Sequence, residues 1–253
     1  MISGPARRFR SGAYAMRIVL PTLEGRLLRR YKRFLADIEL ADGSVVTAHC
    51  PNTGSLLGCT TPGSRVILRD AGEGRRKLRY TFQSIAVGRS LVNVDTSLPN
   101  AAVLEAIERG RIPELAGYDL ARREVRYGER SRIDILLERR GGERCYVEVK
   151  STTLARGRTA LFPDAVTERG RRHLEELTRM VAQGHRAVQF FFVGRGDVAR
   201  FAPADDIDPA YGRALREAVH AGVEVLAWSA AVRRDRLQPR RPLPVELAPS
   251  APG

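Results

Sequence analysis

Cysteine is scarce in this sequence, and its scarcity excludes two classes of small protein. The 253 residues include three cysteines, Cys50, Cys59 and Cys145, with no close paired spacing. A disulfide-stapled domain or a thiolate zinc site would need a paired or clustered set. We therefore expect all three cysteines to be small buried residues of an apolar core.

Long apolar runs are also missing. No stretch of roughly 18 apolar residues, the length that crosses a bilayer, occurs anywhere in the chain. The apolar segment Ile18–Leu20 stops at Pro21 and is too short for the core of a signal peptide. We therefore expect a protein that stays in the cytoplasm and has no membrane partner.

Lysine is the third scarce residue, although the chain is strongly basic. Lys32, Lys77 and Lys150 are the only lysines among 43 basic residues; 29 acidic residues leave a net charge of +14. Such a charge attracts polyanions, and we expect DNA as the partner, with RNA and the oligomeric state left open. Against 40 arginines, typical of a GC-rich genome, a lysine offers a compact point charge that arginine cannot imitate.

The pattern along the chain divides it into four parts. Residues 1–23 lack an apolar period and contain a second methionine, so we expect disorder or a misassigned start. Residues 24–98 alternate like short strands, residues 99–237 alternate between strands and helices, and residues 238–253 form a proline-rich tail that is extended or loose. The strands expected in the first domain are Phe34–Leu40, Val45–His49, Arg65–Arg69, Tyr80–Val87 and Leu91–Val94. Five short strands suit a small barrel of the oligonucleotide-binding (OB) type, with a sandwich as the alternative.

The second domain is expected to be α/β with a mixed sheet. A short helix with one apolar face is predicted to end near Gly110. Two further helices are predicted, over about Asp164–Gln183 and over Pro209–Ala221. The inward residues of the long helix are expected to be Val166, Leu174, Leu177 and Val181. The expected strands are Ala121–Tyr127, Ile133–Glu138, Cys145–Lys150, the buried run Ala187–Val193, and Val223–Trp228.

One strand of this domain carries the sharpest chemical signal. Alternation places Glu148 and Lys150 on the same face of an otherwise apolar strand, where charges are costly to bury without a purpose. Asp134 lies on the preceding strand, and a turn at Gly141-Gly142 is the midpoint between Asp134 and Glu148. Two carboxylates suit Mg²⁺ or Mn²⁺, and a lysine beside them suits phosphodiester hydrolysis. The alternative is a structural ion pair between Glu148 and Lys150.

Further residues are candidates for contacts with nucleic acid. They come from a basic run, a polar turn, a basic cluster followed by aromatics, the Asp134 strand and one side of the long helix. The alternatives are solvated faces and a loop held by its own turn hydrogen bonds. The candidates are Arg33, Asn52, Thr53, Ser55, Arg76, Lys77, Arg132, Arg169 and His173.

The chain resembles a known family in these motifs. The order of elements, with Asp134 on the second strand and Glu148-x-Lys150 on the third, is similar to the PD-(D/E)XK nuclease superfamily. More narrowly, the chain resembles the sugar fermentation stimulation protein A family. The matching stretches are Arg33–Leu40, His49–Leu56, Thr96–Asn100, Gly110–Tyr118, Ser131–Leu136, Tyr146–Thr152 and Phe162–Gly170.

The resemblance implies an OB-like barrel on a nuclease-like domain, DNA binding with little sequence preference, and a regulatory role in sugar (maltose) metabolism. It also implies Glu105 as an additional metal ligand, with Glu124 as the competing choice. Asp95 departs from the asparagine expected there and would add a negative charge near a DNA-binding face. Two alternatives to a nuclease stay open: a non-catalytic DNA-binding regulator that uses the scaffold as a platform, and an RNA-processing protein.

Overall fold

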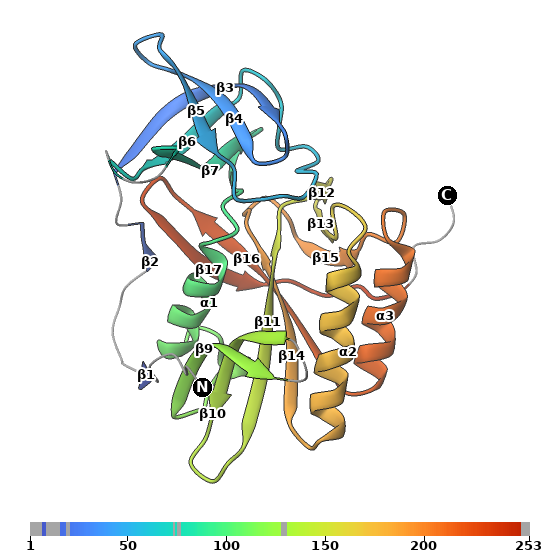
Figure 1. Ribbon diagram of the computed structural model, residues 1–253. Helices are drawn as coiled ribbons and strands as arrows, with labels where there is room; N and C mark the ends of the chain where they lie inside the picture. Colours follow the sequence, from blue (N-terminus) through green and yellow to red (C-terminus); the bar gives the residue numbers. More distant parts are fainter. Residues whose placement is uncertain are drawn as a thin grey trace.

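The computed structural model describes residues 7–8, 16–18, 21–72, 74, 77–127 and 131–248. It has a β-barrel domain followed by an α/β domain, and the barrel caps one end of the larger sheet (Figure 1). None of the helices in these ranges is long and apolar enough to span a membrane. All three cysteines are free and buried, as the sequence indicated.

The first domain is a closed barrel. Five strands run in the order β5-β4-β3-β6-β7, and parallel pairing of Ala48 with Tyr80 joins β5 to β7 and closes the ring, with β8 added beside β7. Closure settles the choice between barrel and sandwich, and Leu27, Ile38 and Phe82 fill the interior. The strands are β3 (Thr22–Tyr31), β4 (Leu35–Leu40), β5 (Val45–His49), β6 (Arg65–Asp70), β7 (Tyr80–Val87) and β8 (Ser90–Asn93).

The strand β3 was not among the five strands expected from the sequence. Two of its arginines, Arg29 and Arg30, were interpreted with Lys32 and Arg33 as a basic run that leads into the first strand. In the structure Arg26, Arg29 and Arg30 are themselves strand residues, and the barrel therefore begins at Thr22. Their charges obscure the alternation because β3 is half-exposed along most of its length.

The second domain is built on a mixed sheet, as expected. Its order is β1-β9-β10-β11-β14-β16-β17-β2, in which β11, β14 and β16 are parallel and the flanking pairs are antiparallel. The strands are β1 (Arg7–Arg8), β2 (Met16–Arg17), β9 (Leu120–Tyr127), β10 (Ser131–Glu138), β11 (Arg144–Thr152), β14 (Arg186–Val193), β16 (Glu224–Val232) and β17 (Arg236–Pro242). A smaller sheet, not anticipated, contains β12 (Ala155–Arg156), β13 (Thr159–Phe162) and β15 (Arg200–Pro203).

Helices cover both faces of the large sheet. One face packs on α1 (Pro99–Glu108), which a short 3-10 helix (Pro113–Leu115) follows, and the other packs on α2 (Glu168–Ala182) and α3 (Pro209–His220) (Figure 1). Along β11, Cys145, Val147 and Val149 join the core under α1, whereas Tyr146 joins the core under α2 and α3. Glu148 and Lys150 therefore share the α2 face with Tyr146.

Three expected boundaries differ in the structure. The helix expected from Asp164 begins four residues later, because the Thr167 side chain caps it by accepting a hydrogen bond from Gly170 N at 3.0 Å. Val166 consequently lies outside α2 and is 67% exposed rather than buried. The segment from Gln238 is extended but not loose, since it pairs with β16 inside the sheet. Two short pieces of the region expected to be disordered pair with edge strands as β1 and β2.

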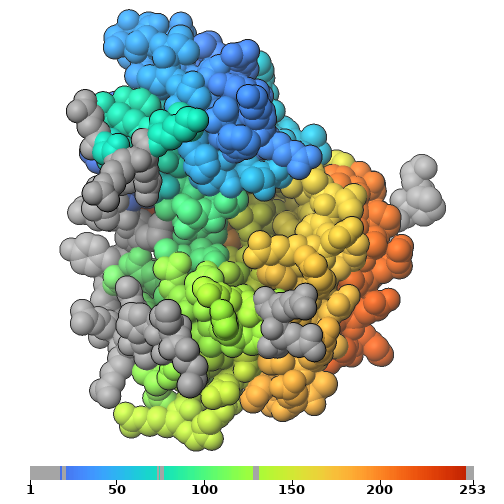
Figure 2. Space-filling view, in the orientation of Figure 1, coloured from blue at the N-terminus to red at the C-terminus, as the bar shows by residue number. Residues whose placement is uncertain are grey.

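Direct hydrogen bonds dock the barrel on the α/β domain. Ser55 Oγ donates to the carbonyl of Asp164 at 2.5 Å, and Leu56 N donates to the carboxylate of the same residue at 2.9 Å. On the far side of the interface Asn93 N donates to the carbonyl of Gly194 at 2.7 Å. Figure 2 shows the barrel, blue to teal, seated against the yellow and orange part of the α/β domain.

Candidate active site

The β10–β11 hairpin sets the register of the candidate site. Ile135 lies opposite Val147, so the hairpin is centred on Gly141, as the sequence predicted. Gly141 and Gly142 both have positive φ, which glycine adopts without a steric penalty. Ile135 and Val147 form the ladder pair farthest from the turn. The next residues outward are Asp134 and Glu148, so this register brings them together at the open end of the hairpin.

Glu148 is the most deeply buried charge of the site. Its side chain is 3% exposed, and Oε1 accepts a hydrogen bond from Lys150 Nζ at 2.8 Å and a shorter one from His173 Nδ1. Burial alone would raise the pKa of this carboxyl, but Lys150 and His173 together hold it below its usual value. Glu148 is therefore a carboxylate in the folded protein.

Asp134 is fixed by two donors from different elements. Oδ1 accepts from Asn100 Nδ2 at the start of α1 at 2.7 Å, and Oδ2 accepts from Val149 N at 2.8 Å. Burial, followed by the negative charge of Glu148, raises the pKa of Asp134 to about 7, against smaller opposing effects of Val149 N–H and Lys150. The two carboxylates thus disfavour each other's ionisation, and a positive charge between them would relieve that cost.

Two residues of α2, Arg169 and His173, form a chain of hydrogen bonds that ends on Glu148. Arg169 Nε donates a hydrogen bond to His173 Nε2 at 3.3 Å, so Nε2 is the acceptor nitrogen of the ring. Nδ1 therefore carries the ring proton and donates a hydrogen bond to Glu148. Lys150 Nζ also lies 3.1 Å from His173 Nδ1, but two donors cannot bond each other, and its partner is Glu148. Both α2 residues chosen from the sequence therefore lie in this cluster, with His173 the one that touches Glu148.

The residues present fit a hard divalent cation. Glu148 Oε2 is buried without a hydrogen-bond partner among the described residues, and Asp134 offers a second carboxylate beside it. Carboxylate oxygens are the ligands that Mg²⁺ and Mn²⁺ prefer. Within the described ranges no three His, Cys, Asp or Glu side chains are grouped closely enough to hold a metal. The fit is thus one of two carboxylates, with other positions open to water or substrate.

The third acidic ligand expected from the resemblance is not brought into this cluster. Glu105 forms an i,i+4 ion pair with Arg109 at 2.8 Å along α1. Glu124 has a stronger connection to the site, because its charge contributes to the raised pKa of Asp134. Its backbone has φ of 54°, in the left-handed region, between residues that pair with Ile133 and Ile135 on β10.

The polar turn of the barrel is held mainly by its own contacts. Asn52 Oδ1 accepts from Gly54 N at 2.8 Å, which is the Asx turn given as the alternative to a phosphate contact. The Ser55 hydroxyl is committed to the domain interface through Asp164. Thr53 and Arg33 are exposed, and both line a cleft of about 310 Å³ beside the end of β11. Ser151, the residue that follows Lys150 on β11, lines the same cleft.

A second cleft of about 980 Å³ lies on the barrel next to the first. Its walls include Lys32, Lys77 and the 47%-exposed ring of Phe34. Four pairs of consecutive residues have one member in each cleft, which makes the clefts neighbours: Lys32 and Arg33, Arg33 and Phe34, Pro51 and Asn52, and Thr96 and Ser97. Of the remaining candidates, Arg132 is exposed on β10, and Arg76 lies outside the described residues.

Sequence reasoning missed two residues that position the carboxylates. Asn100 bonds Asp134, and Gln189, fully buried on β14, donates from Nε2 to the carbonyl of Glu148 at 3.0 Å. An asparagine at the start of a helix and a glutamine inside the apolar run Ala187–Val193 were the available signals. Each is a polar group whose burial needs a partner.

Asp95 is a buried and paired charge. This carboxylate is fully buried, forms an ion pair with Arg69, and accepts hydrogen bonds from the backbone and hydroxyl of Ser97. It is therefore not a free surface charge, although its partners Arg69 and Ser97 both line the second cleft. It instead holds the segment between β8 and α1 in place.

Two family models match the chain, one for each domain. The model described as SfsA N-terminal OB domain matches residues 28–94. The model described as Sugar fermentation stimulation protein RE domain matches residues 97–236. Together they cover the barrel and most of the α/β domain.

Full-length relatives agree with these matches. A Sugar fermentation stimulation protein homolog of Geobacter sulfurreducens is 54% identical over 225 residues, which cover 89% of this chain and 96% of the relative. A homolog from Thioalkalivibrio sulfidiphilus is 54% identical over 228 residues, again covering 89% and 96%. The solved structure of Pyrococcus furiosus SfsA in complex with Ca²⁺ is 32% identical, has a TM-score of 0.84, and is matched over 93% of this chain and 100% of that one.

Proposed function

The chain belongs to the sugar fermentation stimulation protein family, and on that premise we propose that it binds DNA with little sequence preference and hydrolyses phosphodiester bonds with the help of Mg²⁺ or Mn²⁺. The reaction is assigned to Asp134, Glu148 and Lys150. The observation that carries the proposal is the unpartnered, buried Oε2 of Glu148 beside the Asp134 carboxylate, with Lys150 at 2.8 Å. The Ca²⁺ complex of the archaeal relative supports the cation, and the net charge of +14 supports a polyanionic substrate.

The residues of the site divide the chemical work. A divalent cation held by Asp134 and Glu148 would supply activation of water and neutralisation of the scissile phosphate. Lys150 places a protonated amine at the mouth of the cluster, where it donates to the phosphate oxygen that gains charge during the reaction. His173 holds Glu148 through Nδ1–H, and Asn100 holds Asp134, so both carboxylates are oriented before substrate arrives.

The two neighbouring clefts form the proposed track for a DNA strand. Phe34 offers an aromatic face to a base, and Lys32 and Lys77 lie beside it to pair with phosphates. Arg33 and Thr53 continue the track into the smaller cleft, which leads to Ser151 and the end of β11. A base can stack on the exposed ring of Phe34 only when it is unpaired. We therefore expect single-stranded DNA, or an unpaired end, to be the form that is cut.

Cleavage of labelled DNA tests the proposal. Purified protein is incubated with single- and double-stranded oligonucleotides in Mg²⁺, in Mn²⁺ and in a chelator, together with an Asp134→Asn variant. We expect divalent-dependent cutting by the wild type, faster on single strands, and none by the variant. If the wild type does not cut while still binding DNA, the chain is a binding platform; if the variant cuts equally well, the site is wrongly assigned. A matched RNA oligonucleotide distinguishes an RNA-processing protein.

Replacing Phe34 with alanine is expected to weaken binding of single-stranded DNA about tenfold, since one base stacked on an aromatic ring contributes roughly 1–3 kcal/mol. Fluorescence anisotropy with an oligothymidine measures the change at fixed ionic strength. Leu57→Ala is the matched control, because Leu57 is also 47% exposed on the barrel but does not line the cleft. Equal losses in the two variants would contradict a base-stacking role for Phe34.

Replacing His173 with alanine is expected to lower the cleavage rate about 10- to 100-fold, as loss of a group that orients a metal ligand typically does. The same substitution should raise the concentration of Mn²⁺ needed for half-maximal rate, because Glu148 loses its Nδ1–H donor. His173→Gln, which can donate one hydrogen bond, should restore part of the cleavage rate and part of the lost Mn²⁺ affinity. An unchanged Mn²⁺ requirement with a lowered rate would assign His173 to substrate instead.

A further inference from the structure

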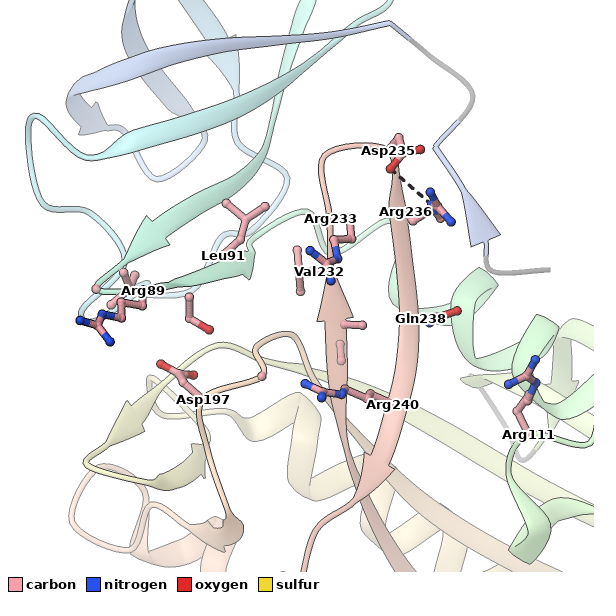
Figure 3. Close-up of a pocket in the computed structure, with 16 residues that line it drawn as sticks. Arg89, Leu91, Arg111, Asp197, Val232, Arg233, Asp235, Arg236, Gln238 and Arg240 are labelled. Atoms are coloured by element: carbon pink, nitrogen blue, oxygen red, sulfur yellow. Dashed lines mark hydrogen bonds and ion pairs between the residues drawn. The ribbon is translucent and has the colours of Figure 1, made fainter. Parts of the chain in front are cut away.

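A third hollow, separate from the proposed active site, lies between the two domains (Figure 3). Its volume is about 1230 Å³. The turn between β7 and β8, with Arg89, forms its barrel side, and β16, β17 and their connection, with Arg233 and Arg240, form its α/β side. Its wall residue Ala230 belongs to the core under α1, whereas Glu148 faces α2. The hollow and the active site therefore lie on opposite faces of the sheet.

The hollow carries an excess of uncompensated positive charge. Five arginines and two aspartates line it. Asp197 is already neutralised by Arg195, which contacts both of its oxygens at 2.7 and 2.8 Å, and Asp235 faces Arg236 at 3.4 Å. Within the described part of the chain no ion pair or hydrogen bond engages the guanidinium groups of Arg89, Arg111, Arg233 and Arg240. Like charges held around one space repel each other, and an anion placed among them relieves that repulsion.

The walls of the hollow are held by contacts between the domains. Asn93 N donates to Gly194 O at 2.7 Å at one border, and a side chain on Gly194 would lie 3.0 Å from the Asn93 carbonyl. At another border Arg234 Nε donates a hydrogen bond to Thr22 Oγ1 at 2.7 Å. The carbonyl of Arg234 accepts a hydrogen bond from Gln83 Nε2 at 3.1 Å. These contacts hold the two walls together, and exposed arginines of both domains line the hollow between them.

The chemistry of the lining identifies the class of ligand. Among the described residues no aromatic side chain lines the hollow, in contrast to the barrel cleft with Phe34, so these residues offer no surface on which a base would stack. Arginine forks instead match phosphate oxygens and can bind them through two parallel hydrogen bonds. We propose that this hollow binds a small anion with several adjacent phosphate groups, which bridges Arg89 of the barrel to Arg233 and Arg240 of the α/β domain. This site does not depend on the proposed hydrolysis.

Calorimetric titration with inorganic tripolyphosphate tests the proposal. Wild-type protein is titrated in a chelator-containing buffer at constant ionic strength, with ATP and a four-residue oligothymidine as parallel ligands. The test variant is Arg233→Gln/Arg240→Gln, and the matched control is Arg213→Gln, an exposed arginine on α3 outside the hollow. We expect one tripolyphosphate per chain, bound at least tenfold more weakly by the double variant and equally well by the control. We expect the same order of affinities in a Lys150→Ala background, which separates this site from the proposed active site.

Thermal unfolding supplies a second readout, because a ligand that touches both domains stabilises their contact. Tripolyphosphate should raise the melting temperature of the wild type and of Arg213→Gln but not that of the double variant. Comparable binding of ATP assigns recognition to the phosphate chain. Equal affinities of all variants, or substitutions that weaken the oligothymidine and leave tripolyphosphate unchanged, would overturn the proposal.

Discussion

Lys150→Ala is expected to reduce DNA cleavage about 10²- to 10³-fold, the largest effect of any single substitution outside the two carboxylates. A positioned donor that stabilises charge in the transition state typically contributes this much to the rate. Lys150 is 13% exposed and lies 2.8 Å from Glu148, so water cannot replace its charge freely. Affinity for DNA should fall little, because the binding track carries many other basic residues.

The comparison with Lys150→Arg gives this prediction its precision. Arginine keeps the charge, but its planar fork is bulkier than the compact ammonium group of lysine. If Lys150 acts through its compact amine, the arginine variant should stay at least tenfold below the wild type. Full activity of Lys150→Arg would show that charge alone suffices, and full activity of Lys150→Ala would remove the residue from the mechanism.

Stability must be followed in parallel, because removal of Lys150 leaves Glu148 as a buried carboxylate with only His173 as partner. Circular dichroism and thermal unfolding of each variant establish that the fold persists. Lys150→Met provides a variant that retains the apolar stem. Loss of cleavage in a folded Lys150→Met protein would then be a loss of chemistry and not of structure.

The central feature of the site could be predicted because two local rules agree. Strand alternation placed Glu148 and Lys150 on one face, and the glycine pair fixed the hairpin register that brings Asp134 opposite Glu148. Both rules depend only on neighbouring residues, and the structure reproduces both. Helical spacing also placed Arg169 and His173 on one side of the long helix, whereas their hydrogen bonds toward Glu148 were not predicted.

The residues that the sequence did not reveal depend on contacts between distant elements. Asn100 reaches Asp134 from α1, and Gln189 reaches Glu148 from β14, 41 positions along the chain. The small sheet with β13 and β15 pairs short segments that carry too few residues for a periodic signal. β3 was hidden because a half-exposed barrel strand tolerates charges that interrupt the pattern.

Mn²⁺ should stabilise the wild-type protein, and Glu148→Gln should abolish that effect. At a free concentration about 100 times Kd, a ligand specific for the folded state adds about 2.7 kcal/mol. For a chain of this size, that corresponds to a rise of about 5–10 °C in melting temperature. The buried, unpartnered Oε2 of Glu148 is the oxygen that the cation would satisfy, and glutamine replaces its negative charge with a neutral amide.

Glu105→Gln is the matched control for this measurement, because Glu105 is an acid of the same domain that pairs with Arg109 instead of joining the cluster. Differential scanning fluorimetry across a Mn²⁺ series should give this variant the full wild-type shift. A shift lost in Glu105→Gln would make Glu105 a ligand after all, with α1 moving toward the site when the cation binds. A shift retained in Glu148→Gln would place the cation elsewhere and leave the buried carboxylate as part of a structural ion pair with Lys150 and His173.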